Sequence, residues 1–276
     1  LHRRRHSFPT RRSSDLITLD QVQSLGWYSV FMVVLAVSLT IGLGIVMAKW
    51  MGFKPFFGLL SGGSVGICGA SAAMAIAAAF PNHPQKDRAT LFVVISVSTL
   101  STVAMVLYPM LVRGLGLDPQ QAGFFLGGTI HDVAQVVGAG YSMGQQTGDA
   151  ATVVKLMRVA MLVPVIVVAA WMTRATHAQS ADSEAAGAPA SRPPLLPWFA
   201  VVFVLLVLLN SLLHLPEVVV STGHGLSRAF LVAAMAAIGI KTHLKDILSV
   251  GWKPVALMLL ETVFLAALVY MLLLQA

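Results

Sequence analysis

The sequence predicts an all-α integral membrane protein, a polytopic helix bundle with two broken or re-entrant helices. The chain is 57% hydrophobic and 11% charged, with a mean hydropathy of +0.81, which is too apolar for a water-facing surface. Apolar runs of roughly 20 residues, enough to cross a bilayer core of about 30 Å as a helix, recur from Trp27 onward. Two other apolar stretches are interrupted by glycines and polar residues, which predicts the broken helices.

Residues 1–16 differ from the rest of the chain. They hold five of the 18 Lys and Arg, show no apolar period, and resemble translated sequencing-adapter read-through, so we treat them as non-native or disordered. A basic cytoplasmic tail or a signal n-region is the alternative, and we expect a gene truncated at its 5′ end. Removing five positive charges and one negative charge lowers the net charge from +7 to +3, which leaves no nucleic-acid footprint.

Residues 17–173 are predicted to hold the first group of membrane helices. Full spans are expected at Trp27–Ala48, Ala89–Val112 and Ala151–Met172. Between them, Phe56–Phe80 is interrupted near Ser61–Gly66 and again near Cys68–Ser71, and Gln121–Met143 carries polar residues and several glycines. A polar, Gly-rich segment at membrane depth must line a cavity or be buried in protein.

An Ala/Pro-rich linker is predicted at residues 174–197, before the C-terminal membrane helices of residues 198–276. Spans are expected at Trp198–Leu213, Leu226–Ile240 and Pro254–Leu274. If every segment crosses the membrane, the loops with Lys49, Lys54 and Arg113 share one side, and those with Lys86 and Arg88 share the other. A re-entrant segment would change that grouping.

The two interrupted segments resemble each other. Gly58–Gly66 aligns with Gly123–His131, which suggests duplicated supersecondary units. Paired Gly-interrupted segments of this kind point to the binding site of a transporter, so we interpret Gly62, Gly63, Gly127 and Gly128 as chain breaks. The alternative, close helix packing at small residues, has equal weight for Gly69 and Gly138–Gly140.

Ionisable residues occur inside these apolar segments. A carboxylate such as Asp132 costs about 2.5–3.5 kcal/mol at the bilayer centre, so it is expected to have a function. A histidine in water titrates near neutral pH, so His131 together with Asp132 would suit proton coupling; a structural ion pair from Asp132 to Lys155 or Arg158 is the alternative. Asp132 and Gln135, three residues apart, can share a helix face.

Lys155 and Arg158 share one helix face near the start of a span. They would either extend to the membrane interface or supply the positive charge that meets an anionic substrate. Glu261 is the single acidic residue inside the last span, and a functional role and a structural one weigh equally. No nucleophile, phosphate-loop or metal motif occurs and Cys68 is the single cysteine, so an enzyme, a cofactor and a metal site are not expected.

Several motifs resemble the YeiH family of proposed sulfate exporters, and the resemblance extends from about Ile17 to the end. The motifs are Gly66–Ala72, Gly128–Gly140, Lys155–Val159, Pro197–Ala200, Asn210–Ser211 and Ala233–Thr242. The resemblance implies ten or eleven spans in the whole protein, arranged as inverted repeats like those of bile-acid and sodium/proton transporters, with the first portion lacking here. Many relatives carry Glu at the position of Asp132, which keeps the charge.

We therefore expect a secondary transporter of the bacterial inner membrane that exports a small anion, such as sulfate, sulfite or a sulfonate-type anion, coupled to protons or another ion. A cation/proton antiporter using Asp132 and a non-transporting membrane scaffold are the alternatives. The lipid bilayer is an expected partner, a homo-oligomer is left open, and no nucleic acid is expected. His131 and Asp132 are the predicted proton-coupling residues, and the predicted substrate-binding residues are Gly63, Ser64, Cys68, Gly69, Ser71, Thr129, His131, Gln135, Lys155 and Arg158.

Overall fold

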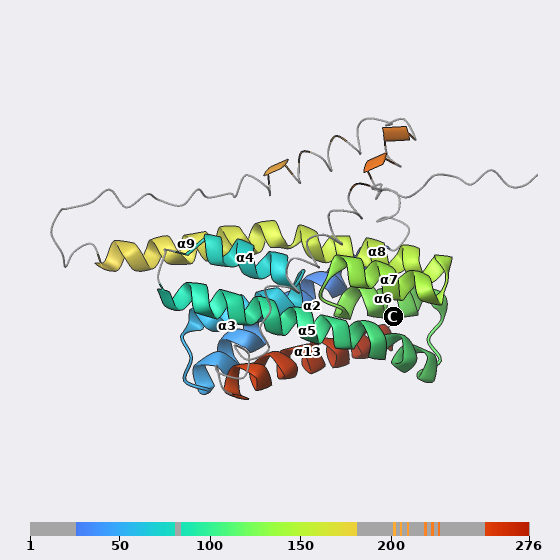
Figure 1. Ribbon diagram of the computed structural model, residues 1–276, viewed down its shortest axis with the longest axis horizontal. Coiled ribbons are helices and arrows are strands. Elements are labelled where there is room, and N and C mark those ends of the chain that lie inside the picture. The colour runs from blue at the N-terminus through green and yellow to red at the C-terminus, as the bar shows by residue number, and fades with distance from the viewer. Residues whose placement is uncertain are drawn as a thin grey trace, which may run out of the picture.

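The computed structural model describes residues 26–80, 84–180 and 252–275, with isolated positions between 201 and 226. The residues 1–16, most of the predicted linker and the predicted spans 198–213 and 226–240 lie outside this description, apart from those isolated positions. Within the three ranges the elements are the helices α2 (Gly26–Trp50), α3 (Pro55–Gly66), α4 (Ala70–Ala78), α5 (Pro84–Gly114), α6 (Pro119–Thr129), α7 (Val133–Met143), α8 (Gln145–Ala160), α9 (Leu162–Ser180) and α13 (Trp252–Leu273) (Figure 1).

The predicted all-α membrane architecture is confirmed. Four helical stretches of the described residues are long and apolar enough to cross a membrane: Trp27–Trp50, Lys86–Gly114, Gln145–Trp171 and Trp252–Leu273. The third stretch combines α8 and α9, which follow one another along one side of the bundle (Figure 1). Pro164 accounts for the interruption at Met161, because proline has no N–H to donate to the carbonyl of Ala160.

The first interrupted segment folds back on itself as a hairpin of α3 and α4. The rings of Phe56, near the start of α3, and Phe80, just after α4, lie 4.5 Å apart. Deeper in the hairpin, Gly63 faces the side chain of Ile76. These pairs make α3 and α4 antiparallel neighbours, so the segment is re-entrant. We call α3–α4 the first hairpin and residues Ile67–Gly69 its tip.

The second interrupted segment is also a hairpin, formed by α6 and α7. Gly123 near the start of α6 and Gly140 near the end of α7 both approach the first turns of α8 around Thr147 and Ala151. The two outer ends of this segment are therefore close together. We call α6–α7 the second hairpin and residues Ile130–Asp132 its tip. In Figure 1 the two hairpins enter the bundle from opposite ends.

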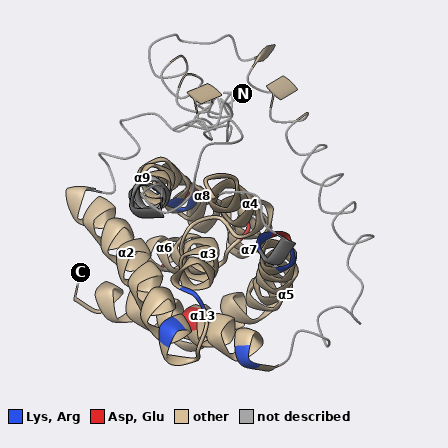
Figure 2. Cartoon of the chain, turned by 90° about the vertical axis from the view of Figure 1, so that its left-hand side faces the viewer, with Lys and Arg blue, Asp and Glu red and all other residues tan. Residues whose placement is uncertain are grey.

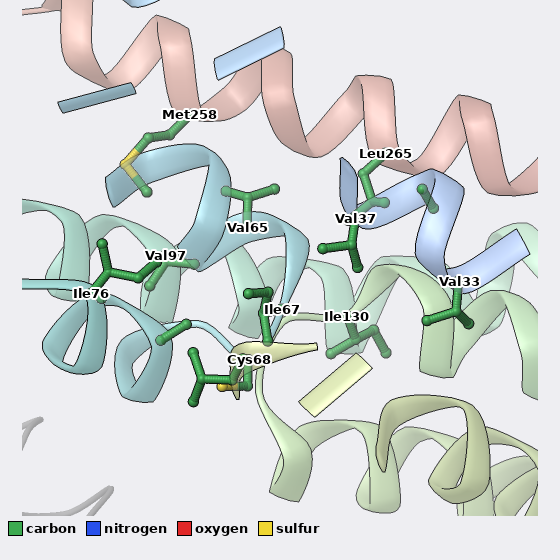
Figure 3. Packing of buried hydrophobic residues seen from close by; sticks show 14 of the residues in the cluster. Val33, Val37, Val65, Ile67, Cys68, Ile76, Val97, Ile130, Met258 and Leu265 are labelled. Atoms are coloured by element: carbon green, nitrogen blue, oxygen red, sulfur yellow. The ribbon is translucent and has the colours of Figure 1, made fainter. Parts of the chain in front are cut away.

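Helix length explains why the hairpins stop inside the bundle. The twelve residues of α3 span about 18 Å, against a hydrocarbon core of roughly 30 Å, and α4, α6 and α7 are shorter still. The tips meet in the interior: a Cβ placed on Gly69 would lie 3.5 Å from the Cβ of His131. Gly69 has φ +66°, a conformation that glycine adopts without steric cost. In Figure 3, Ile67 and Cys68 lie beside Ile130 within one buried cluster.

Matching turns precede the two hairpins. Gly52 (φ 86°) lies in the turn after α2, and Gly116 (φ 67°) lies in the turn after α5. In each turn the next residue donates to the carbonyl five positions earlier: Phe53 N to Ala48 O at 2.8 Å, and Leu117 N to Val112 O at 3.4 Å. Two residues later, Pro55 and Pro119 begin α3 and α6. The duplicated unit is thus a long helix, a glycine turn and a hairpin, and the two units point in opposite directions.

The interpretation of Gly62, Gly63, Gly127 and Gly128 as chain breaks is wrong. All four lie inside α3 or α6, and the chain instead turns after the ends of these helices, at the two tips. Gly58 and Gly62 pack against the α2 backbone, whereas Gly123 and Gly127 pack against α8, so a Cβ at any of them would collide or crowd. The repeated glycines therefore allow close approach of helices, the alternative that we considered for small residues.

The re-entrant hairpins also change the grouping of the charged loops. Lys86 Nζ donates to Phe80 O at 3.2 Å, and Phe80 stacks on Phe56 beside Lys54. Lys86 therefore lies at the same end of the bundle as Lys49 and Lys54, not at the opposite end. We call this the Lys-rich end; Figure 2 views the bundle from that side and shows charge at few positions along the helices.

Candidate functional site

Lys155 lies at the centre of the bundle, where the two hairpin tips meet. It is on α8 and its side chain is fully buried. Its ammonium donates to Ile67 O at 2.8 Å in the first tip, and to Ile130 O at 3.0 Å and His131 O in the second. A lysine has three N–H donors, so all three are used by backbone carbonyls.

Arg158, one turn further along α8, joins the same two hairpins. Its side chain is 1% exposed. The guanidinium donates from Nε to Gly66 O at 2.9 Å and from Nη2 to Val65 O at 2.8 Å, both at the end of α3. Nη1 donates to Gly127 O at 3.1 Å and Ile130 O at 3.2 Å. Four of its five N–H groups are thereby used.

These contacts place positive charge at the negative ends of two helix dipoles. The last carbonyls of a helix have no partner within the helix, and they carry roughly half a negative charge in total. Lys155 and Arg158 satisfy these carbonyls at the C-termini of both α3 and α6. They do not extend to the membrane interface, because neither side chain is exposed. Among the residues that the structure describes, no carboxylate forms an ion pair with either of them.

His131 sits in the second tip and is fully buried. Its Nδ1 lies 3.1 Å from Val65 O, and its Nε2 lies 3.2 Å from the hydroxyl of Thr262 on α13. A carbonyl can only accept, so Nδ1 must carry a proton. His131 therefore connects the first hairpin, the second hairpin and α13.

Asp132 caps α7. Its carboxylate accepts from Ala134 N at 2.8 Å and Gln135 N at 3.3 Å, and its own N–H donates to Ser101 on α5. The side chain is half-buried. Negative charge at a helix N-terminus stabilises the helix dipole. Asp132 lies before the first residue of α7, so it does not share a helix face with Gln135, whose side chain donates to Thr102 instead. The ion pair of Asp132 with Lys155 or Arg158 is not seen among the described residues.

The remaining predicted site residues lie either at the first tip and the start of α4, or inside α3 and α6. Cys68 and Gly69 lie in the first tip, and Ser71 is exposed in the first turn of α4. Gly63, Ser64 and Thr129 lie inside α3 or α6, before the tips, where the two hydroxyls donate back to their own helices, Ser64 to Leu60 O and Thr129 to Phe125 O. The structure therefore brings together Cys68, Gly69, His131, Asp132, Gln135, Lys155 and Arg158.

Several partners of these residues have no signal in the sequence. Thr102 on α5 accepts from Gln135 Nε2 at 3.1 Å, and Ser101 accepts from the Asp132 amide. Ser61 donates to Glu261 on α13 at 2.8 Å. Isolated Ser and Thr residues are common in membrane helices and reveal nothing by themselves.

The described part of the chain contains no group of three or more His, Cys, Asp or Glu residues that could hold a metal ion.

Two opposed re-entrant hairpins that meet around buried cations, inside a bundle of long apolar helices, define a multi-pass membrane protein of transporter-like architecture. The family model described as Conserved hypothetical protein 698 matches residues 16–258. The chain belongs to this family, UPF0324, in agreement with the resemblance to YeiH. The bacterial relatives are named as membrane proteins, which supports the predicted location in the bacterial membrane.

The chain is 52% identical over 253 residues to a UPF0324 membrane protein of Chlorobaculum tepidum, covering 92% of this chain and 69% of that protein. It is 49% identical to the UPF0324 membrane protein TauZ of Paracoccus denitrificans, covering 92% and 73%. A UPF0324 membrane protein of Rhizobium meliloti is 43% identical, with 91% and 71% covered. No solved structure matches the chain significantly.

Proposed function

We propose that this protein is a secondary transporter that exports a small oxyanion, such as sulfate or sulfite, in exchange for or together with protons. The meeting of two hairpin tips around Lys155 and Arg158 supports a solute site inside the membrane. The choice of sulfate and the export direction come from the resemblance to the YeiH family.

The charge balance at the tips is the observation that supports an anion as the substrate. Lys155 and Arg158 contribute +2, and Asp132 contributes −1. The C-termini of α3 and α6 contribute about −0.5 each, and the N-termini of α4 and α7 about +0.5 each. The sum is about +1 among the described groups, in an interior where charge is weakly screened, so an anion would be stabilised there.

The donors that remain suggest how the anion is held. Lys155 has no free N–H, so it acts by charge at short range rather than by direct contact. The start of α4 has no side-chain cap, and the Ala72 amide faces the Cys68 sulfur. The amides of Ala70 and Ser71 and the Ser71 hydroxyl remain as donors for the anion. Anions bind readily at such helix N-termini. The equivalent end of α7 is already occupied by Asp132.

The orientation follows from the distribution of Lys and Arg. Lys49, Lys54, Lys86 and Arg88 lie at or near the Lys-rich end, whereas Arg113 lies at the opposite end of α5. Cytoplasmic loops carry an excess of these residues, so the Lys-rich end would face the cytoplasm. The first hairpin would then enter from the cytoplasmic side. Accessibility of single cysteines placed at Lys54 and Arg113 to a membrane-impermeant thiol reagent tests this.

Labelled-sulfate flux tests the function directly. The purified protein is reconstituted in liposomes, and Lys155→Gln and Arg158→Lys are compared with Lys253→Gln, which removes an exposed charge at the start of α13. We expect flux in the wild type and in Lys253→Gln and its loss in Lys155→Gln. Arg158→Lys keeps the charge, so it should retain sulfate binding even where flux falls. Equal flux in Lys155→Gln and the wild type would rule the proposal out.

The alternative functions give other results in the same assay. A cation/proton antiporter using Asp132, whose half-buried carboxylate favours it, would lose cation-driven proton movement in Asp132→Asn and would not bind sulfate. A scaffold would lose no flux in any variant because it would have none.

A further inference from the structure

Glu261 is a buried carboxyl that the proposed anion site does not use. It lies in the middle of α13 and is fully buried. Its Oε1 accepts from Ser61 Oγ on α3 at 2.8 Å, whereas its Oε2 is buried without a hydrogen-bond partner among the described residues. The α2 backbone closes the site, since a Cβ on Gly44 would fall 2.6 Å from Oε1. One neutral hydrogen bond is little compensation for an ionised carboxylate at this depth.

No cation of the described chain compensates Glu261. On α13 itself, Lys253 is exposed near the helix start and Tyr270 lies more than two turns beyond Glu261. Lys155 and Arg158 are held by the hairpin tips. On the elements that pack against α13, the ionisable groups away from helix ends are Tyr108 on α5 and His131; the others lie at or near helix ends: Tyr28, Lys49, Lys54, Lys86, Asp87, Arg88, Arg113 and Asp118.

The Ser61 hydroxyl can serve either form of this carboxyl. Ser61 Oγ lies 2.8 Å from Glu261 Oε1 and 3.4 Å from Gly58 O in its own helix. A hydroxyl has one proton, so it cannot donate to both at once. Beside a carboxylate, Ser61 donates to Glu261. Beside a protonated carboxyl, Ser61 accepts from Glu261 and donates to Gly58 O.

The next residue of α13 repeats this arrangement. Thr262 Oγ1 lies 3.2 Å from His131 Nε2 and 2.8 Å from Met258 O. Beside a neutral imidazole it donates to Nε2, and beside an imidazolium it accepts from Nε2–H and donates to Met258 O. Each titratable group thus faces a hydroxyl that can turn to a carbonyl of its own helix. Glu261 and Thr262 are adjacent, so α13 carries both pairs side by side.

We propose that Glu261 and Ser61 form a proton-binding site that exchanges a proton with water and, where the proposed anion transport holds, couples that proton to the anion. On binding, H⁺ converts the Glu261 carboxylate to a carboxyl, the new O–H donates to Ser61 Oγ, and the Ser61 hydroxyl turns to Gly58 O. Release reverses each step. His131 and Thr262, one position further along α13, bring a second titratable pair next to the hairpin tips.

Infrared difference spectroscopy tests the proton site without any transport. The wild type is expected to show a carboxyl C=O band that disappears as the pH is raised. Glu261→Gln is nearly isosteric with the protonated side chain and should lack this band. Asp87→Asn, which removes an exposed carboxylate at the start of α5, should retain it. A titrating band of equal size in Glu261→Gln, or a wild-type band that never titrates, would overturn the site.

Coupling is tested in liposomes that contain a pH-sensitive dye. An outward sulfate gradient should drive proton movement in the wild type and in Asp87→Asn, and this movement should fall to background in Glu261→Gln while sulfate binding persists. Proton movement that is unchanged in Glu261→Gln contradicts the coupling role. If the wild type moves no sulfate, the proposed transport fails, and the infrared result still decides whether Glu261 binds an exchangeable proton.

Discussion

The two hairpins share a backbone design but differ in charge. Both follow a glycine turn and a proline, both pack on a neighbouring helix through paired glycines, and both end their first helix on carbonyls held by Lys155 and Arg158. The second helix of each pair differs: α7 is capped by Asp132, whereas α4 has no side-chain cap. One helix start is therefore capped by a carboxylate and the other has no side-chain cap, although the backbone design is the same.

The largest effect is expected where one side chain joins both hairpins. Arg158→Leu removes a donor from four carbonyls. Val65 O keeps His131 Nδ1 and Ile130 O keeps Lys155 Nζ. Gly66 O and Gly127 O lose the side-chain donor, and each unsatisfied buried group costs about 1–3 kcal/mol. We expect the thermal midpoint of the detergent-solubilised protein to fall steeply, while exposed Arg113→Leu changes it little. Hydrogen exchange should increase at both tips; an increase at one tip alone would mean that the hairpins are not joined at Arg158.

The next largest effect is expected at the glycines through which the hairpins pack against α2 and α8. Gly58→Ala would collide with α2, and Gly127→Ala would collide with α8, each destabilising by about 1–3 kcal/mol. Gly138→Ala is the matched control, because a Cβ there meets nothing within 4 Å, and it should stabilise α7 by about 0.5–1 kcal/mol. Thermal unfolding of the three variants checks this. Equal midpoints would show that close backbone packing is not what the glycines provide.

A smaller effect is expected from the cap that distinguishes the hairpins. Asp132→Ala removes the side-chain acceptor at the start of α7 and should cost about 1 kcal/mol. Asp132→Asn keeps an oxygen for the cap and should cost less. Hydrogen exchange should become faster at the first-turn amides of α7 and stay unchanged at those of α4. Faster exchange at both helix starts in Asp132→Ala would argue against a local cap.

The smallest effect concerns the contact of α13 with the second tip. Thr262→Val keeps the shape of the side chain but removes its hydrogen bond to His131, at a cost of about 0.5–1.5 kcal/mol. Thr99→Val is the control, because Thr99 is exposed and donates to Ile95 O within α5. Nitrogen NMR of the imidazole should detect the loss at Nε2. An unchanged Nε2 signal in Thr262→Val would exclude the contact.

Much of the fold could be predicted from local sequence. Long apolar runs predict α2, α5, α8–α9 and α13, because a helix in lipid needs little more than length and hydrophobicity. The sequence also marks the two interrupted segments and the ionisable His131, Lys155 and Arg158, whereas the burial of Lys155 and Arg158 is a finding of the structure. The interruption predicted near Cys68–Ser71 coincides with the first tip. The breaks predicted at Gly62, Gly63, Gly127 and Gly128 do not coincide with a turn, because these residues lie inside helices and Gly62 and Gly127 pack against other helices.

The sequence by itself determined that this chain is a helical membrane protein with duplicated interruptions and buried charge, since hydrophobicity and glycine content act over a few neighbouring residues. Only the tertiary structure decided what those charges meet. Lys155 binds carbonyls 24 to 88 residues away, and Ser61 reaches Glu261 across 200 residues. Such partners depend on which helix faces another, and no local pattern encodes that choice.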